Sequence, residues 1–579
     1  MIMAEYLSPG VYVEEFDSGP TPMQGVGTST AGFIGVAEKG PVTGAPVLVT
    51  GPADFTRKFG GYLHESEFGE YRFLAHAVNH FFINGGSRAF VMRVAPSDAA
   101  VAKAKCAKGK EGVLDIEAKS PGSWGNTVIL TFEPTSDSKT QILEDIGEGK
   151  YRLKNAAGFD KGDIVALEGA GETQYGVVKN STGDIVTFDT PFEGKVVDDK
   201  LLPQITIKTC EMNVVVDHEG DLEKYPKVSF NAFAPSFIEK AMSKSEIVFL
   251  KAKPESSAVA PIDIVKQVFG KDGDEIKIGL SGGTNGTASK LTDDDFIGQD
   301  KGPGSRTGIQ SFLDNSEVNI MAVPGITSAN VQLSLVNHCE KLASRFAVLD
   351  IPMTAKSVAD IMEHRDIVDS DYCAMYHPWL QVFDPLDKKD TFIPPSGSVM
   401  GIYARSDNSR GVHKAPANEV VANCTGLMVN YNVAEQDLLN PKGVNLIRRF
   451  PGAGIRVWGA RTASSKALWK YINVRRLFIY LEESIKANTN WVVFEPNDTA
   501  LWSRVRRTIE LFLEGMWRSG ALVGGSPDEA FFVDIGPNTM NQDDIDNGRL
   551  ICVIGVAPVK PAEFVIFRIT QKTGGSEGE

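Results

Sequence analysis

The hydrophobic and polar positions follow two different periods along the chain, and together they predict a mixed architecture. Short apolar runs, such as 31–36 and 346–350, are typical of buried strands. Runs with apolar residues three or four apart, such as 71–83 and 331–345, are typical of amphipathic helices. A strand at 318–325 precedes the second of these helices and the strand at 346–350 follows it, an order that favours a parallel pair. The predicted fold class is therefore α/β (mixed α+β), with several domains.

The pattern changes between residues 101 and 307. Short β-like runs at 163–167, 175–178 and 184–188 are separated by glycine-rich turns. This stretch contains 24 Lys, 2 Arg and 33 acidic residues. We interpret it as an inserted, mostly β domain, because both flanking regions have α/β character. Its lysine-rich, arginine-poor and acidic composition suggests that this domain lies on an outer, solvated surface.

Strands are predicted at 470–474, 491–494 and 550–556 in the C-terminal part of the chain. Between the last two, Asp498 or Thr499 is a candidate N-cap for a long helix. The apolar face of this helix consists of Trp502, Val505, Ile509 and Phe512. Arg504 and Arg507 should therefore point away from the apolar face.

Each end of the chain carries a strand-like run without a hairpin partner nearby in sequence. A single short strand is not stable in water, so each must pair with a sheet of its own chain or of another. The N-terminal run includes Val11, Tyr12, Val13 and Glu14, and the C-terminal run includes Phe564, Val565, Ile566, Phe567 and Ile569.

These patterns divide the chain into five parts. They are an N-terminal arm (1–25), a middle α/β domain built from both chain ends (26–100 and 308–440), the inserted β-rich domain (101–307), a C-terminal α/β domain (441–562), and a C-terminal arm strand with a loose tail (563–579).

Composition narrows the function. The 579 residues carry 59 Lys and Arg against 74 Asp and Glu, a net charge of −15, which argues against direct nucleic-acid binding. The chain has no apolar run of 18 residues, and its first ten residues do not resemble a secretion signal, so no membrane insertion is expected. The six cysteines are widely spaced, which favours reduced, buried thiols of a protein made in a cytoplasm over disulfides or a zinc site.

Motifs that would indicate enzymatic chemistry are missing. The sequence has no HExxH, GxSxG or Walker A pattern, so no catalytic residue and no cofactor is expected. The loop 282–287 lacks the lysine of a phosphate-binding loop and is interpreted as a tight turn. His76 and His80 have the spacing of two metal ligands, but without the neighbouring glutamate and a third ligand we expect no metal. The acidic run 293–295 is interpreted as a solvated loop.

A basic segment is the strongest charge feature. Residues 442–507 carry 13 basic and 4 acidic residues within an acidic chain, and arginine predominates. Arginine suits bidentate contacts with carboxylates. Arg504 and Arg507 have no obvious partner in the same helical turn and are candidates for an external acidic partner, although a merely solvated basic face remains an alternative.

Several ordered stretches resemble contractile tail sheath proteins of bacteriophages and phage-tail-like injection particles. They are Tyr6–Glu15, His377–Leu380 with Asp384-Pro385, Pro394–Arg405, Arg410–Asn418, Val457–Thr462, Asn473–Leu477 with Glu482–Ser484, and Phe494–Asn497. The resemblance covers residues 1–95 and about 308–570. Both sheath-like halves lie in one chain, which is more similar to phage and extracellular particles than to type VI secretion sheaths.

The resemblance implies a structural role without catalysis. Subunits would polymerise helically around an inner tail tube, with baseplate and tail-terminator proteins as further partners. Terminal arms would add strands to the C-terminal sheets of neighbours, and Arg504 and Arg507 would face the tube. Contraction would drive the tube through a target envelope with energy stored in the extended assembly. The particle, a virion tail or a released injection particle, would be assembled in a bacterial cytoplasm.

Two other functions remain open from the residues alone. A static surface-layer or capsid-type protein would also self-associate, but would need neither two pairing arms nor a basic inner face. An α/β enzyme would need a convergent polar pocket, for which the sequence offers no nucleophile and base.

Overall fold

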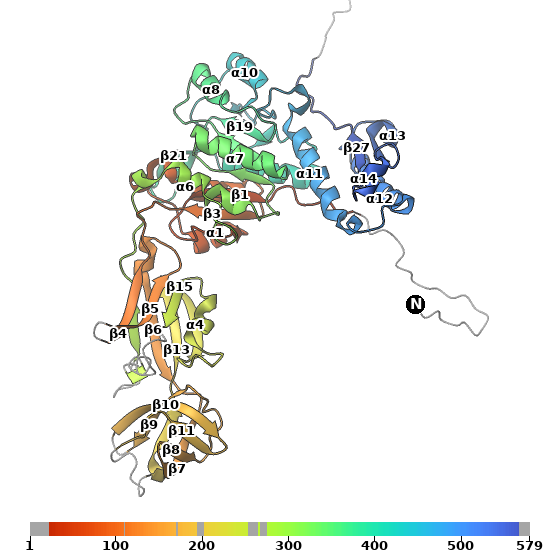
Figure 1. Cartoon of the computed structure of the whole chain (residues 1–579). Coiled ribbons are helices and arrows are strands. Elements are labelled where there is room, and N and C mark those ends of the chain that lie inside the picture. Colours follow the sequence, from red (N-terminus) through yellow and green to blue (C-terminus); the bar gives the residue numbers. More distant parts are fainter. Residues whose placement is uncertain are drawn as a thin grey trace, which may run out of the picture.

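The computed structural model describes residues 23–108, 111–169, 172–193, 202–252, 265–266 and 275–566. Figure 1 shows a large α/β unit, an elongated insertion that extends from one end of it, and a smaller C-terminal unit beside helix α11 (Ile472–Asn488). Helices and several sheets occur together, and this confirms the predicted mixed fold class.

The large unit is built on a nine-stranded sheet with the strand order β2-β3-β1-β17-β18-β19-β24-β25-β22. The strands from β3 to β24 run parallel to one another, while β2, β25 and β22 pair antiparallel at the two edges. The predicted parallel pair is confirmed as β17 and β18. The strands are β1 (Ala31–Val36), β2 (Val47–Val49), β3 (Ala89–Val94), β17 (Ile320–Ala322), β18 (Phe346–Asp350), β19 (Cys373–His377), β22 (Glu419–Val420), β24 (Val444–Phe450) and β25 (Gly454–Val457).

Residues from both sides of the insertion therefore share one sheet. The strand β1 pairs with β17 across more than 280 residues of sequence. The sheet also continues past residue 440, the expected start of the C-terminal domain, because β24 pairs with β19 through Met375–Val444 and its neighbours. The C-terminal unit accordingly lies after this sheet, and α11 connects the two, because Ile472 and Ile479 belong to the core of the large unit and Leu477 and Leu481 to that of the C-terminal unit.

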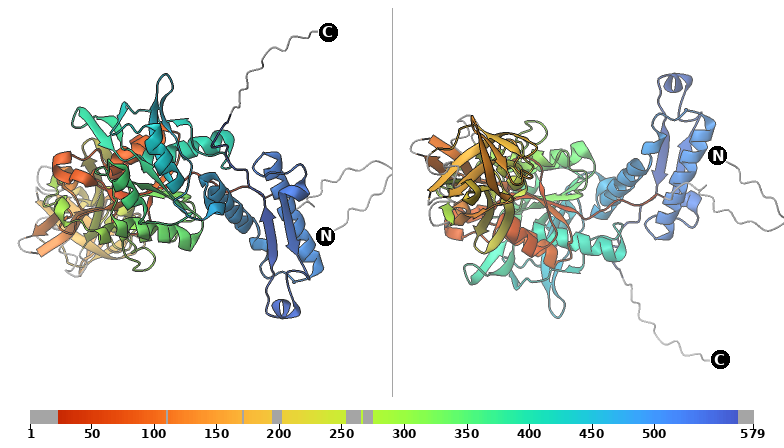
Figure 2. Two further views of the ribbon diagram at one scale, coloured as in Figure 1. Left: turned by 90° about the horizontal axis from the view of Figure 1, so that it is seen from above. Right: turned by 90° about the horizontal axis from the view of Figure 1, so that it is seen from below.

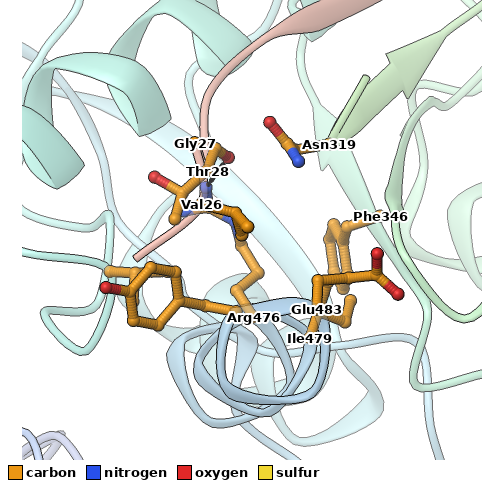
Figure 3. Close-up of a pocket in the computed structure, with 10 residues that line it drawn as sticks. Val26, Gly27, Thr28, Asn319, Phe346, Arg476, Ile479 and Glu483 are labelled. Carbon is orange, nitrogen blue, oxygen red and sulfur yellow. Dashed lines mark hydrogen bonds between the residues drawn. The ribbon is translucent and has the colours of Figure 1, made fainter. Parts of the chain in front are cut away.

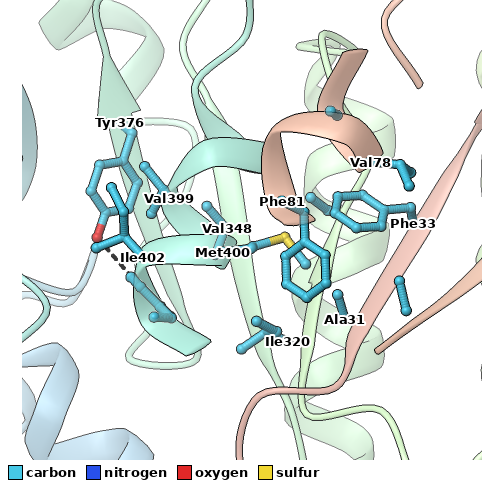
Figure 4. Packing of buried hydrophobic residues seen from close by; sticks show 14 of the residues in the cluster. Ala31, Phe33, Val78, Phe81, Ile320, Val348, Tyr376, Val399, Met400 and Ile402 are labelled. Carbon is cyan, nitrogen blue, oxygen red and sulfur yellow. Dashed lines mark hydrogen bonds between the residues drawn. The ribbon is translucent and has the colours of Figure 1, made fainter. Parts of the chain in front are cut away.

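Helices cover both faces of the sheet. The helices α1 (Pro52–Phe59), α3 (Leu74–Ile83) and α9 (Ser396–Arg410) share one apolar core with it, and α6 (Asp293–Ile297), α7 (Ala329–Leu342) and α8 (Val358–Arg365) share the other. Figure 4 shows the first core, where Phe81 of α3 and Met400 of α9 lie over the sheet residues Phe33 and Ile320. Such packing on both faces explains why these strands are apolar without alternation.

Two glycines let α9 and α3 approach closely. A Cβ atom at Gly397 would lie 2.4 Å from the carbonyl oxygen of Ala77, and one at Gly401 would lie 2.4 Å from that of Phe81. Both contacts are with backbone, which cannot move aside as a flexible side chain can. The four-residue spacing places both glycines on the face of α9 that contacts α3.

The chain enters and leaves the insertion through two neighbouring segments that are hydrogen-bonded to each other. Ala100 and Thr284 exchange backbone hydrogen bonds of 3.1 and 3.0 Å, and Lys103 and Ser281 exchange bonds of 2.8 and 3.1 Å. The buried Arg93 of β3 donates to the carbonyl oxygen of Pro121 at 2.6 Å, and thereby fixes this part of the insertion to the large unit.

Beyond this neck the insertion forms two β units with separate cores. The first consists of the sheets β14-β13-β6-β16 and β15-β5-β4, and the second is a closed barrel with the order β10-β11-β8-β7-β12-β9. The predicted strands at 163–167, 175–178 and 184–188 are all found in the barrel, as β9, β10 and β11. The bounds are β4 (Lys103–Lys108), β5 (Glu111–Ala118), β6 (Val128–Thr135), β7 (Lys139–Gly147), β8 (Lys150–Leu153), β9 (Ile164–Gly169), β10 (Glu172–Thr182), β11 (Ile185–Phe188), β12 (Thr206–Thr209), β13 (Glu211–His218), β14 (Asp221–Val228), β15 (Val248–Ala252) and β16 (Ile276–Gly279). The short helix α4 (Ile238–Ala241) precedes β15.

The C-terminal unit packs the long helix α12 (Thr499–Arg518) on a two-stranded sheet of β26 (Phe531–Ile535) and β27 (Cys552–Val556), with the short helices α13 (Pro527–Ala530) and α14 (Gln542–Asp546) at its margins. Figure 2 shows this unit set apart from the rest of the molecule. The predicted cap is confirmed, since the Asp498 side chain accepts a bond from Leu501 N at 2.8 Å. The predicted apolar face is confirmed too, because Val505, Ile509 and Phe512 share a core with the sheet.

Three local predictions are wrong. Residues 470–474 enter α11 instead of a strand, because Ile472, Val474 and their helical neighbours bury on two sides and packing overrides the β propensity of the run. Residues 491–494 form the end of a 3₁₀ turn (Asn490–Val492) and a largely exposed loop, and they pair with no strand among the described residues. The acidic run 293–295 is no loop but the first turn of α6, with Thr292 and Asp295 forming a capping box.

Candidate inter-subunit surfaces

The sheet of β26 and β27 has two open edges. The strands pair antiparallel from Phe531–Val556 to Ile535–Cys552, and in the described part of the chain no third strand pairs with either one. One face is covered by α12, while on the other face Phe532 and Val553 are 56% and 45% exposed. Two-stranded sheets are marginally stable on their own, and open edges beside exposed apolar side chains are typical of sites where a strand from another chain adds.

Glu563 is the last described residue of the C-terminal segment that is fixed to the large unit by side-chain hydrogen bonds. Its carboxylate accepts a bidentate pair of bonds from Arg461, at 2.7 Å from Nε and 2.6 Å from Nη2. Asn440 Nδ2 donates to the same carboxylate at 3.0 Å and the Tyr471 hydroxyl donates at 3.2 Å. Burial opposes ionisation of Glu563, but the bonds from Arg461 and Asn440 outweigh it, so the pKa of this carboxyl lies below its usual value. The contribution of this ion pair to stability is therefore present at neutral pH and is lost as the pH falls through that lowered pKa.

The three large apolar residues that follow Glu563 are exposed to solvent. Phe564, Val565 and Ile566 are 73%, 70% and 78% exposed and belong to no strand. The strand expected from residue 563 on is thus not formed as far as Ile566. Phe567 and Ile569 lie outside the described residues, as do Val11, Tyr12, Val13 and Glu14 of the N-terminal run.

The root of the N-terminal arm is also anchored, along α11. The Arg476 guanidinium donates to both carboxylate oxygens of Asp407, at 2.9 and 2.5 Å, and to the carbonyl oxygen of Thr28 at 2.9 Å. The Thr28 hydroxyl donates to Asp407 at 2.7 Å, which closes the cluster. Both charged side chains are only 3% exposed. In Figure 3, Arg476 reaches from its helix toward Thr28, and the residues around them leave a cavity of about 10 Å³, room for no more than one water.

The two candidate tube-facing arginines lie on the exposed side of α12, as the helix pattern predicts. Arg504 has a partner that the sequence does not reveal, since it donates to Glu495 at 3.0 Å and lies 5.0 Å from the Trp491 ring. Arg507 is exposed and forms no ion pair with any described residue. Arg506, in contrast, donates to the Ile535 carbonyl oxygen at 2.9 Å and belongs to the packing of the unit itself.

Part of the basic segment 442–507 is neutralised within the chain. Arg461, Arg475 and Arg476 each pair with a carboxylate from outside the segment, namely Glu563, Asp371 and Asp407. The charge that the segment shows to a partner is therefore smaller than the sequence count. On the exposed side of α12 it comes from Arg507 and from Arg504, whose charge is partly offset by Glu495.

Two family models match most of the C-terminal half of this chain. The model of the phage tail sheath protein central domain matches residues 302–463, and that of the phage tail sheath C-terminal domain matches residues 464–572. The chain belongs to the phage tail sheath family. The two matches meet where the nine-stranded sheet ends and α11 approaches, and the inserted β units lie outside both.

Individual sheath proteins agree with this assignment. The chain is 24% identical over 385 residues to the tail sheath protein of Escherichia phage P2, covering 63% of this chain and 92% of that protein. It is also 24% identical over 284 residues to a prophage major tail sheath protein of Pseudomonas aeruginosa (strain UCBPP-PA14), covering 47% and 71%. The sheath of an extracellular contractile injection system, PVC, solved in the contracted state, has the same fold, with a TM-score of 0.51 and 20% identity over 98% of this chain and 99% of that chain.

The two histidines of this sheath protein that have the spacing of metal ligands belong to its interior. His76 and His80 are buried, and burial lowers the pKa of each to about 4, so both are neutral at neutral pH. His80 contacts the Ser398 hydroxyl at 3.2 Å. No cluster of three or more His, Cys, Asp or Glu in the described residues could hold a metal ion, and no described helix is long and apolar enough to cross a membrane.

Sequence reasoning missed the two arm anchors. Glu563 and Arg461 lie 102 residues apart, and Asp407 and Arg476 lie 69 apart, so no local pattern joins them. The one available signal was the excess of arginine in 442–507, since arginine is the cation best suited to buried bidentate pairs.

Proposed function

We propose that this chain is the subunit of a contractile sheath, which polymerises helically around an inner tube and shortens to drive the tube through a target envelope. The observation that carries the proposal is the sheet of β26 and β27, with two open edges on a chain that has an exposed apolar segment at Phe564–Ile566. A chain that offers both a strand and an edge can join its neighbours head to tail, and such contacts generate open helical polymers.

The two arms supply the added strands. In this arrangement the runs at Val11–Glu14 and Phe564–Ile569 pair with the open edges of neighbouring subunits. Backbone hydrogen bonds hold the subunits together during contraction, while the rigid units of the chain change their relative positions. The anchors at Thr28 and Glu563 support this role, because a strand under load needs a fixed root.

The tube side is α12. Arg504 and Arg507 dock on acidic tube residues in the extended state and release them on contraction. Exposed pairs contribute only about 0–1 kcal/mol each, which suits a contact that has to break. Arg504 can exchange Glu495 for a tube carboxylate without being desolvated, since its side chain is 59% exposed.

Reversing both charges is expected to weaken the extended state specifically. In an Arg504→Glu/Arg507→Glu variant, the ratio of extended to contracted particles in electron micrographs should fall several-fold, and the effect should shrink at high salt because exposed charges are screened over about 8–10 Å. The matched control reverses two exposed lysines of the insertion, Lys227→Glu/Lys277→Glu, and should leave the ratio unchanged. An unaltered ratio in the arginine variant would assign the tube contact to another surface.

The insertion faces outward and is not needed for assembly. Its lysine-rich, acidic surface suits solvent. Besides the neck at Lys103 and Ser281, it contacts the large unit at a few points, such as the Arg93–Pro121 hydrogen bond and the exposed ion pair of Arg57 and Glu246. The insertion ends before residue 291, because Leu291 and Phe296 belong to the core of the large unit.

Replacing residues 104–280 by a short Gly/Ser bridge is therefore expected to preserve sleeves of normal length in sedimentation and microscopy. A bridge fits because Lys103 N and Ser281 O are 2.8 Å apart in the intact chain. A folded but unassembled product would show instead that the insertion carries contacts between subunits.

The driving energy lies in the assembly itself. If contraction buries an additional ~500 Å² of apolar surface per subunit, the upper bound of the gain is ~12 kcal/mol at ~25 cal/mol/Å². Summed along a sleeve, this is sufficient without a nucleotide or an enzymatic step. Baseplate and terminator proteins would set where the sleeve begins and ends, and assembly would take place in a bacterial cytoplasm, before release as a virion tail or an injection particle.

Negative-stain microscopy of the particles tests the proposal. Sleeves in two states, one long and narrow and one short and wide, are expected. Sheets or shells of one fixed geometry would instead indicate a static surface-layer or capsid-type protein, and a monodisperse monomer under all conditions would contradict both.

A further inference from the structure

The anchor at Glu563 is built more rigidly than an ordinary surface ion pair. Arg461 is 8% exposed and Glu563 is 19% exposed, and every nitrogen–oxygen distance in the cluster is 3.0 Å or less. The backbone of Arg461 is held as well, because the buried Asn445 of β24 accepts from its N–H at 2.8 Å and donates to its carbonyl oxygen at 2.7 Å. Glu563 is thus connected through one arginine to the central sheet.

This anchor lies away from the hairpin that precedes it in the chain. The strand β27 ends at Val556, and residues 557–563 then cross from the C-terminal unit to the large unit. Two contacts fix this crossing on the way, one from Asn473 Nδ2 to the Val559 carbonyl oxygen at 3.1 Å and one from Val559 N to Ala521 O at 3.2 Å. The crossing contains Pro558 and Pro561, neither of which can donate a backbone hydrogen bond to a sheet.

Without the anchor, the C-terminal segment would have a nearer pairing partner, the sheet of β26 and β27 in its own chain. A segment that follows β27 after seven residues has the spacing of a hairpin with a longer loop, so Phe564–Ile566 could fold back on an open edge of their own sheet. Such intramolecular pairing would compete with pairing between subunits at a high effective concentration. It would also occupy the edge that a neighbour needs, which would end the polymer.

We infer that Arg461 and Glu563 form a clamp that keeps the C-terminal segment from pairing with its own sheet and so reserves both segment and edge for neighbouring subunits. The inference rests on the proposed function, in which this segment adds to a neighbour's sheet. Arg461 and Glu563 are positioning residues, since neither lies in the sheet where the strands pair.

Crosslinking distinguishes pairing within a chain from pairing between chains. A Val565→Cys variant provides one thiol in the segment, and the native Cys552 of β27 provides the other, so a flexible bismaleimide can join them in whichever register the strands adopt. In the otherwise unchanged chain we expect intermolecular ladders on a denaturing gel. With Arg461→Ala added, we expect the ladder to fall at least several-fold and an intramolecular product of monomer size to replace it. A Cys552→Ser version should lose both products.

Two comparisons separate the clamp from general damage. Arg475→Ala breaks an equally buried pair, with Asp371, that does not touch the segment, and it should leave the ladder intact. Exchanging the charges, Arg461→Glu with Glu563→Arg, should restore part of the ladder that either single change removes. An undiminished ladder in Arg461→Ala, or an equal loss in Arg475→Ala, would overturn the clamp.

A truncation tells failure of the clamp from failure of the proposed function. Chains that end at Glu563 keep the clamp but lack the strand. If they assemble normally, the strand addition itself is wrong. If they fail to assemble while Arg461→Ala crosslinks and assembles like the parent, strand addition stands and the clamp is wrong.

Discussion

Subunits without either terminal arm are expected to fold and stay soluble but to form no stable sleeves. Deleting residues 1–16, or everything after Glu563, removes one added strand per subunit. If each strand contributes four net backbone hydrogen bonds of about 1 kcal/mol, the loss is about 4 kcal/mol per subunit contact, close to a thousandfold in affinity. The described core loses little, because Phe564–Ile566 are largely exposed and the anchors at Thr28 and Glu563 remain.

Sedimentation of the assembled fraction measures this effect. Removal of the polar tail alone, residues 574–579, is the matched control and should leave the pelleted fraction unchanged. Circular dichroism of the soluble truncated subunits checks that they are folded. Long sleeves of normal yield from either arm deletion would contradict the role of that arm.

Breaking the buried pair of Arg476 and Asp407 is expected to destabilise the subunit by about 3–5 kcal/mol, because removing one partner leaves an uncompensated charge in the interior. In Arg476→Ala, the carboxylate of Asp407 keeps only the Thr28 hydroxyl of the partners described above, and Thr28 loses the donor to its carbonyl oxygen. Both the melting temperature of the unassembled subunit and the attachment of the N-terminal arm should therefore fall.

Thermal unfolding of the soluble subunit measures the first effect. The double change Arg476→Met/Asp407→Leu fills the same space without a charge and should cost clearly less than either single change to alanine. If the double change costs as much as the two single changes together, the pair would contribute through packing and not through its charges.

The parts of the fold that the sequence predicts are those governed by local periodicity. The strands at 31–36 and 346–350 and the helix after Asp498 have patterns long or apolar enough to override their surroundings. The run 470–474 misleads for the opposite reason, since its β-branched residues are equally compatible with a strand and the choice is made by burial on two sides of α11. The same holds for 293–295, where only the capping box reveals a helix.

The candidate surfaces divide in a similar way. The exposed position of Arg504 and Arg507 follows from helix geometry. The segment at Phe564 is recognised as a candidate arm because no strand nearby in sequence could pair with it. Arg461 with Glu563 could not be found, because the pair joins positions far apart in sequence and its meaning depends on where residues 557–563 cross. The open edges of β26 and β27 likewise require the topology of the sheet.

The narrow neck of the insertion has a consequence for the history and the engineering of such particles. Entry and exit of the chain are neighbours in an antiparallel bridge, so any folded domain with adjacent termini can take the place of residues 104–280 at little cost in loop entropy. With the insertion on the outside of the particle, as proposed above, selection could exchange it while the rest of the subunit stays the same. For the same reason, the Lys103–Ser281 bridge is a natural graft point, where one fused binding module would be displayed in a repeating helical array.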